Sequence, residues 1–344
     1  MAIQVGQCAY RGIIIKINCR GTGTQVIIPR GGRCNNVRLW DYKERVIIQI
    51  AYVCVPTLNY VVRYIDSAAE RLKVATHGWG AEVLALQRID GTWGGVAWKH
   101  GWDSTMHALT LLRDFGLDPH GEPARKALSL VRKHVTWTNS GPEECAKNAF
   151  FTGKVEPRIN GQVGSIEAYF GQDVAGPIQR LLREELADGG WNCEVEFGSI
   201  RGSFHTTICV LEALLDYEIK TGGNPELTSV RLRGQNYLLK RHLFRKLSSG
   251  EAITLDSHGG TWSSFAFPHW WHYDVLRALD YLRRAGMQPD ERLAEAIALV
   301  QSKRQADGRW LLDIVYPGKM LLGLGEREGQ PNRWITLLAL RVLK

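Results

Sequence analysis

Apolar residues recur at every third or fourth position through most of the chain from Asp66 onward. This period predicts amphipathic helices, because residues at that spacing lie on one helix face. Four stretches can be aligned so that their apolar residues fall at the same positions of the helical period. They are Leu109, Leu112 and Phe115; Leu211, Leu214 and Tyr217; Leu276, Leu279 and Leu282; and Leu337, Leu340 and Leu343. Residues 160–173 form a weaker fifth copy. The first 60 residues differ, since short Ile/Val runs separated by Gly predict strands with glycine turns.

A turn recurs three times between the predicted helices. It reads QRIDGTW at 87–93, ELADGGW at 185–191 and RQADGRW at 304–310. We interpret Asp90, Asp188 and Asp307 as turn formers, and the tryptophan that follows each as packing on the next helix. Such a unit cannot bury its apolar stripe alone, so neighbouring units must cover one another. The pattern predicts an all-α body whose helical hairpins close into a ring or continue as an open superhelix.

The change of pattern predicts a boundary near residue 65. We expect residues 66–344 to form the helical domain. Residues 1–65 form an extension that is either β-rich or poorly ordered, and a mis-assigned start is an equal alternative. Residues 1–64 carry nine basic and two acidic side chains, whereas the other 280 residues carry 34 and 33. The basic character therefore belongs to the extension, and a near-neutral body argues against a nucleic-acid partner.

Cysteine use and hydropathy bear on location. The seven cysteines are an odd number, and no secretory signal opens the chain, so a reduced cytoplasmic protein is expected. The apolar segment Val46–Val62 is short for a membrane span and contains Gln49, Pro56 and Asn59. Peripheral association with a membrane remains open.

The turn at Gln87–Trp93 resembles the QW repeat of squalene–hopene and oxidosqualene cyclases and, more loosely, of protein prenyltransferase β-subunits. Glu185 and Arg304 stand in place of the glutamine in the other two copies. The resemblance covers roughly residues 70–344. It implies an (α/α) toroid whose inner helices surround a deep, mostly apolar pocket for an isoprenoid or similar lipid.

The chain departs from both branches of that family. Squalene–hopene-type cyclases use an Asp-x-Asp-Asp acid motif, and this sequence contains none. Matching the helix register at 277–279 places the acid positions at His269–His272. His205 matches the zinc-binding histidine of prenyltransferases, but the Asp-x-Cys partner is missing and Cys193 is the nearest thiol. Zinc held by Cys193, His205 and Asp103 is an open alternative, and no other cofactor is expected.

In such a toroid the inner helices begin at one mouth of the pocket, so residues at those starts should converge. As acid–base groups we consider Asp274, His272, His205 and Asp103. His272 and Asp274 lie two residues apart, about 200° around a helix, so they should not pair and Asp274 suits a helix cap better. The substrate-binding candidates are Trp270, Trp271, Trp262, Phe204, Arg333 and Trp334.

Three functional hypotheses follow from these residues. The first is an isoprenoid-binding toroid that catalyses terpenoid cyclisation or prenyl transfer. The second is a toroid without catalysis that binds a lipid or a partner protein, which the missing acid motif favours. The third is a polysaccharide-active α/α toroid in which tryptophans stack on sugars, and the Gly-x-Trp turns argue against it.

Overall fold

The structure is a computed structural model that describes residues 2–8, 12–19, 22–28, 37–41, 46–51, 61–138, 147–173, 175–254, 261–325 and 327–344, with side chains from Glu70 onward. The chain divides into two compact units, Met1–Arg71 and Leu72–Lys344. The proposed extension at residues 1–65 and its role remain predictions.

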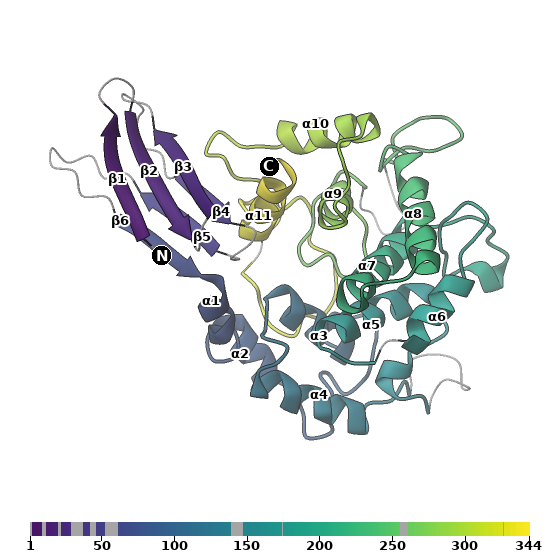
Figure 1. Cartoon of the computed structure of the whole chain (residues 1–344). Coiled ribbons are helices and arrows are strands. Elements are labelled where there is room, and N and C mark those ends of the chain that lie inside the picture. Colours follow the sequence, from purple (N-terminus) through teal and green to yellow (C-terminus); the bar gives the residue numbers. More distant parts are fainter. Residues whose placement is uncertain are drawn as a thin grey trace. The chain divides into compact units, whose positions relative to one another are not determined.

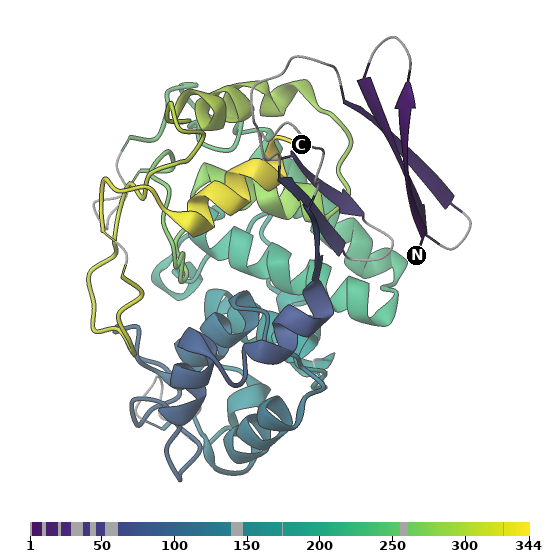
Figure 2. The same cartoon turned by 90° about the vertical axis from the view of Figure 1, so that its left-hand side faces the viewer.

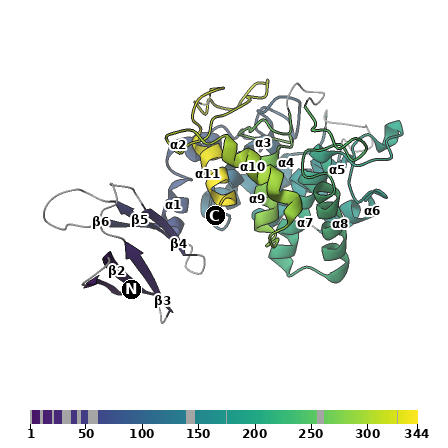
Figure 3. The same cartoon turned by 90° about the horizontal axis from the view of Figure 1, so that it is seen from above.

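The N-terminal unit contains two antiparallel three-stranded sheets (Figures 1 and 3). Their strands are β1 (Ala2–Cys8), β2 (Gly12–Cys19) and β3 (Thr22–Ile28) in one sheet, and β4 (Val37–Asp41), β5 (Val46–Ala51) and β6 (Val61–Asp66) in the other. In β2 the Ile run pairs with β3, with Ile14 opposite Ile27. The candidate membrane segment Val46–Val62 begins as strand β5, and its residues 52–60 lie outside the described part.

The second unit is built from helices. They are α1 (Ser67–Lys73, which spans the boundary), α2 (Gly78–Ala85), α3 (Thr105–Asp114), α4 (Glu122–His134), α5 (Pro157–Tyr169), α6 (Ala175–Arg183), α7 (Phe204–Thr221), α8 (Pro225–Leu239), α9 (Val275–Arg284), α10 (Ala294–Ser302) and α11 (Arg333–Val342). Three short 3₁₀ turns, η2 (Phe150–Thr152), η3 (Val195–Phe197) and η4 (Glu291–Leu293), lie between them in the described residues. Among the described residues, no helix is long and apolar enough to cross a bilayer.

The repeated turn is confirmed, and it has the same hydrogen bonds in all three copies. Each aspartate Oδ1 accepts a backbone N–H two residues on, at 3.0–3.1 Å. Each central glycine has a φ of 78–85°, a region that a side chain disfavours. The indole N–H of each tryptophan, Trp93, Trp191 and Trp310, donates to the carbonyl ten residues earlier, at the end of the preceding helix. Each tryptophan backbone N–H then donates to a threonine hydroxyl in the following helix. The turn therefore connects two successive helices through one buried ring.

The most extensive helix contact is between α5 and α7 (Figure 2). A methyl group on Gly161 of α5 would lie 2.6 Å from the carbonyl oxygen of Cys209 on α7. The absence of a side chain at Gly161 therefore lets the two backbones approach each other closely. Helices α9 and α11 also pack against each other, and α7 packs against α8 (Figure 3).

The predicted apolar phase is confirmed in three of the four aligned helices. Leu109, Leu211 and Leu276, with the leucines three residues further on, are at most 3% exposed. In α11 the prediction is wrong, since Leu337 is 39% and Leu340 43% exposed. Helix α11 instead buries Ile335 and Ala339.

Candidate functional site

Side chains from α3, α5, α7, α9 and α11, with the loop that precedes α9, line one cavity of about 310 Å³. We call it the central cavity. Part of its wall is apolar and is formed by Tyr169, Phe267, Trp270, Tyr281, Trp334, Leu337 and Leu338. The rest carries charge, from Arg113, Asp114, Glu212, Asp216, Arg277, Asp280, Arg284 and Arg341. The wall is therefore mixed: the positions of these helices that face the cavity hold ion pairs as well as rings, which the expectation of a mostly apolar pocket did not include.

The loop HWWH, His269–His272, directs its side chains to different places. His269 and Trp270 line the central cavity. Trp271 lines another cavity, of about 870 Å³, next to Arg158, whose guanidinium lies 4.5 Å from the indole centroid. His272 is 3% exposed and stacks between Trp271 and Tyr316, with centroid distances of 3.7 and 3.4 Å. The loop therefore separates two cavities, and each of its two consecutive tryptophans lines a different one.

Trp270 closes one end of the central cavity. Its ring stacks on Trp102 at 5.1 Å, and the ring of His107 meets it edge-on at the same distance. Burial lowers the pKa of His107 to about 3, so this imidazole is neutral at pH 7. The backbone of Trp270 has a φ of 52°, which is uncommon for a bulky residue and needs support from its surroundings.

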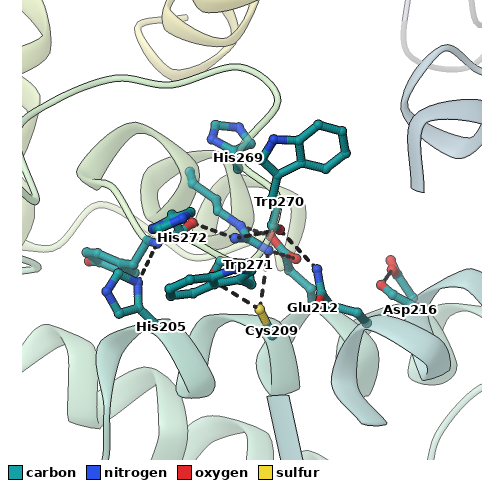
Figure 4. A network of polar contacts seen from close by, with 12 residues as sticks. His205, Cys209, Glu212, Asp216, His269, Trp270, Trp271 and His272 are labelled. Atoms are coloured by element: carbon teal, nitrogen blue, oxygen red, sulfur yellow. Dashed lines mark hydrogen bonds and ion pairs between the residues drawn. The ribbon is translucent and has the colours of Figure 1, made fainter. Parts of the chain in front are cut away.

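Arg277 in α9 supplies that support, and Figure 4 shows the network of polar contacts around Trp270, His272 and Glu212. Its guanidinium donates to the carbonyls of Trp270 and His272 and, at 2.7–2.8 Å, to both carboxylate oxygens of Glu212 on α7. Burial raises the pKa of Glu212, but the charge and hydrogen bonds of Arg277 outweigh it and lower the pKa to about 2. A second pair, Arg284 with Asp216, continues the network along the same two helices. These ion pairs hold the HWWH loop in place and keep Glu212 ionised.

His269 pairs with Asp274, at 3.2 Å between Nδ1 and Oδ2. Asp274 is 1% exposed, and its other oxygen accepts the Arg277 backbone N–H, so its predicted role as the cap of α9 is confirmed. A carboxylate only accepts hydrogen bonds, so Nδ1 of His269 carries the proton and Nε2 is the acceptor in the neutral ring. His269 is thus the oriented imidazole of the central cavity. The helix register had placed the acid positions of the resembled family at His269–His272, but His269 was not chosen as an acid–base candidate, because its pairing with Asp274 depends on the fold of the loop.

Three predicted residues gather at a separate cavity. Phe204, His205 and Trp262 line a space of about 630 Å³ at the start of α7, which we call the second cavity. The His205 ring meets Trp262 edge-on at 4.9 Å and contacts Trp271 and His272 on its other side (Figure 4). His205 and His272 therefore lie close together, but neither lines the central cavity.

The remaining candidates lie elsewhere. Asp103 is 4% exposed and pairs with Lys99 at 3.0 Å, before α3 begins. Arg333 is exposed, and its guanidinium lies over the ring of Trp79. Cys193 lines the same cavity as Trp271, and its sulfur contacts the Thr206 hydroxyl at 3.6 Å. Within the described ranges, no three His, Cys, Asp or Glu side chains gather as metal ligands, so Asp103, His205 and Cys193 do not form a zinc site there.

Comparison with known proteins gives neighbours of low similarity. No family model and no curated protein matches the chain. Three similar solved structures are all of the type II terpene cyclase MstE from Scytonema. A variant without ligand is 19% identical, with a TM-score of 0.38 over 80% of this chain and 83% of that one. The apo enzyme is 17% identical, with a TM-score of 0.38 over 80% and 85%. A variant bound to its substrate geranylgeranyl dihydroxybenzoate is 17% identical, with a TM-score of 0.36 over 88% and 90%. Because these TM-scores are low, the function proposed below is drawn from this chain's own residues.

Proposed function

We propose that the chain binds an isoprenoid or similar lipid in the central cavity, and that α3, α5, α7, α9 and α11 are the inner helices of an α/α toroid. One observation carries this proposal: residues from all of these helices, far apart in sequence, line the same cavity. The aromatic side of the wall suits an unsaturated hydrocarbon, which packs well on flat rings. The arginine-rich side suits a polar or anionic head on the same molecule.

We further propose that the reaction class is terpenoid cyclisation or prenyl transfer, with His269 as the group that moves a proton. His269 lines the cavity, and its bond to Asp274 leaves Nε2 as the atom that can accept a proton from a ligand. Asp274 acts through His269 and is a positioning residue. Asp103, His272 and His205 do not line the central cavity, so none of them is assigned a role in this step.

Binding without catalysis is a second candidate, favoured by one specific observation. The carboxylates that line the central cavity pair with arginines: Glu212 with Arg277 and Asp216 with Arg284. Asp114 pairs with Arg113, and Asp280 with Arg283. Because Arg277 lowers the pKa of Glu212 to about 2, this carboxylate cannot donate the proton with which squalene–hopene-type cyclases begin.

The test measures binding and turnover separately. Squalene and geranylgeranyl diphosphate are incubated with the full chain; native mass spectrometry detects bound ligand, and mass spectrometry of the extracted lipids detects product. Leu337→Trp fills the cavity wall, whereas Leu340→Trp on the same helix adds the same ring at a position of similar exposure outside the cavity.

We expect binding by the parent chain and by Leu340→Trp, and at least tenfold weaker binding by Leu337→Trp. Turnover that disappears in His269→Gln, with binding retained, supports the catalytic role. Binding without product supports the second candidate. If neither lipid binds, or if both tryptophan variants bind equally, the proposed site is wrong. A cytoplasmic location with peripheral membrane contact remains a prediction.

A further inference from the structure

We propose that the second cavity is a binding site for a small organic phosphate, independent of the lipid proposed for the central cavity. The residues that line it are Asp188, Arg201, Gly202, Ser203, Phe204, His205, Tyr237, Arg241, Lys246, Leu247, Ser248 and Trp262. They combine three cationic side chains, two serine hydroxyl groups and the rings of Phe204, Tyr237 and Trp262 in a volume of about 630 Å³.

The ring of Tyr237 forms a rigid part of the cavity wall. It lies against Gly190 and Gly202, where an added methyl group would come within 3.0 Å and 2.8 Å of ring carbons. The Tyr237 hydroxyl donates to the carbonyl of Gly202 at 2.6 Å. The two glycines therefore make the space in which the ring is held flat against the turn of the second repeat.

Arg241 lies over that ring and is held in place before any ligand arrives. Its guanidinium carbon is 3.7 Å from the ring centroid of Tyr237. Nη1 donates to the Tyr237 carbonyl at 2.9 Å, and Nη2 lies 3.4 Å from the Asp188 carboxylate. A guanidinium has five N–H donors in a fixed plane, so these two contacts leave donors for a ligand in the cavity. A stacked, oriented arginine is well suited to phosphate, which it can bind through two parallel hydrogen bonds.

The charges of the second cavity favour an anion. Arg201 and Lys246 join Arg241 on its wall, and among the described lining residues the one acid is Asp188. That acid is already engaged, since its oxygens accept the backbone N–H groups of Gly190 and Gly202. Lys246 pairs with Glu251 at 3.4 Å in an exposed position, a contact that is weak in water.

Neutral donors complete the polar side. Ser203 precedes the first residue of α7, yet its side chain makes no capping hydrogen bond to that helix. The backbone N–H of Tyr273 donates to Nδ1 of His205 at 2.9 Å, which fixes this ring in the wall of the cavity. Phe204 and Trp262, whose rings meet edge-on at 5.5 Å, form the apolar wall. The body of the ligand is therefore expected to be aromatic or apolar.

Isothermal titration calorimetry of the full chain with phenyl phosphate, inorganic phosphate and phenol tests whether the cavity binds both the phosphate group and the aromatic body of the ligand. We expect phenyl phosphate to bind with the highest affinity, inorganic phosphate more weakly, and phenol not measurably. Lys246→Ala should weaken the binding of phenyl phosphate about fivefold, since one charge-assisted contact is lost. Arg241→Lys keeps the charge but loses the planar guanidinium that stacks on Tyr237, and it should weaken the binding of phenyl phosphate further.

Arg309→Ala is the matched control, because Arg309 is an exposed cation in the turn of the third repeat, away from the second cavity. It should bind phenyl phosphate like the parent chain. Trp262→Phe should reduce the advantage of phenyl phosphate over inorganic phosphate. If phenyl phosphate does not bind, binds no better than inorganic phosphate, or is weakened equally by Lys246→Ala and Arg309→Ala, the proposal is overturned. The Lys246 variant keeps the test valid even if the Arg241 variant fails to fold, since Lys246 is largely exposed.

Discussion

Glu167 in α5 makes the stability of the helical unit depend on pH. It is fully buried, and within the described residues neither carboxyl oxygen has a hydrogen-bond partner. Burial raises the pKa of Glu167 from 4.5 to about 9; the charge of Asp173 adds to the rise and that of Lys220 opposes it. The side chain is therefore protonated in the folded protein at pH 7 and ionised in the unfolded chain.

The direction and size of the pH dependence follow from this difference in protonation between the folded and unfolded states. Between pH 4.5 and about 9 the folded state binds one more proton than the unfolded state, so the free energy of unfolding falls as the pH rises. Each pH unit corresponds to about 1.4 kcal/mol, so the loss is about 3 kcal/mol by pH 7 and about 6 kcal/mol by pH 9. Glu167→Gln removes the titration. The variant should match the parent near pH 4.5 and exceed it by about 3 kcal/mol at pH 7.

Urea unfolding followed by circular dichroism at 222 nm, at several pH values from 4.5 to 9, measures the difference. Glu122→Gln is the control, because Glu122 is an exposed carboxylate at the start of α4 and its loss should leave the pH profile unchanged. Glu167→Met tests the same idea with an apolar side chain of similar length. Parallel pH profiles for the parent and both Glu167 variants would refute the reasoning.

Three further predictions concern packing and buried pairs. Gly161→Ala should destabilise the fold by about 1–3 kcal/mol, because the added methyl group meets the backbone of α7. Gly176→Ala, in the open first turn of α6, should stabilise the fold by about 0.5 kcal/mol. Thermal unfolding of both variants measures the difference. Arg277→Met should cost about 3–5 kcal/mol by leaving Glu212 buried and unpaired, and the double variant with Glu212→Leu should recover most of it in urea titrations. Trp191→Phe should cost about 1–3 kcal/mol, since the carbonyl that accepts its indole N–H stays buried without a donor, and a fall in Tm would show it.

Local patterns account for much of the helical unit. The four aligned apolar stretches at Leu109, Leu211, Leu276 and Leu337 predicted helices, and the structure has α3, α7, α9 and α11 there. The Asp-Gly-x-Trp turns were also predictable, because a turn and its cap are formed by residues close together in sequence. These features need only neighbours along the chain.

The central cavity was only partly predictable. Trp270 and Trp334 were expected there and line it. His269 was missed because loops have no period, and its pairing with Asp274 depends on how the HWWH loop folds back. The charged wall was missed because Glu212 and Arg277 lie on separate helices, and a helical period says which residues share a face but not which face meets another helix.

The sequence by itself therefore determined the helical character, the repeated turns and the caps, because these depend on contacts within a few residues. Only the tertiary structure decided which rings line which cavity, that arginines pair with the cavity carboxylates, and that α11 buries Ile335 and Ala339 rather than Leu337 and Leu340. Those outcomes depend on contacts between residues 50 or more positions apart, such as Arg277 with Glu212, and on the order in which helices cover one another.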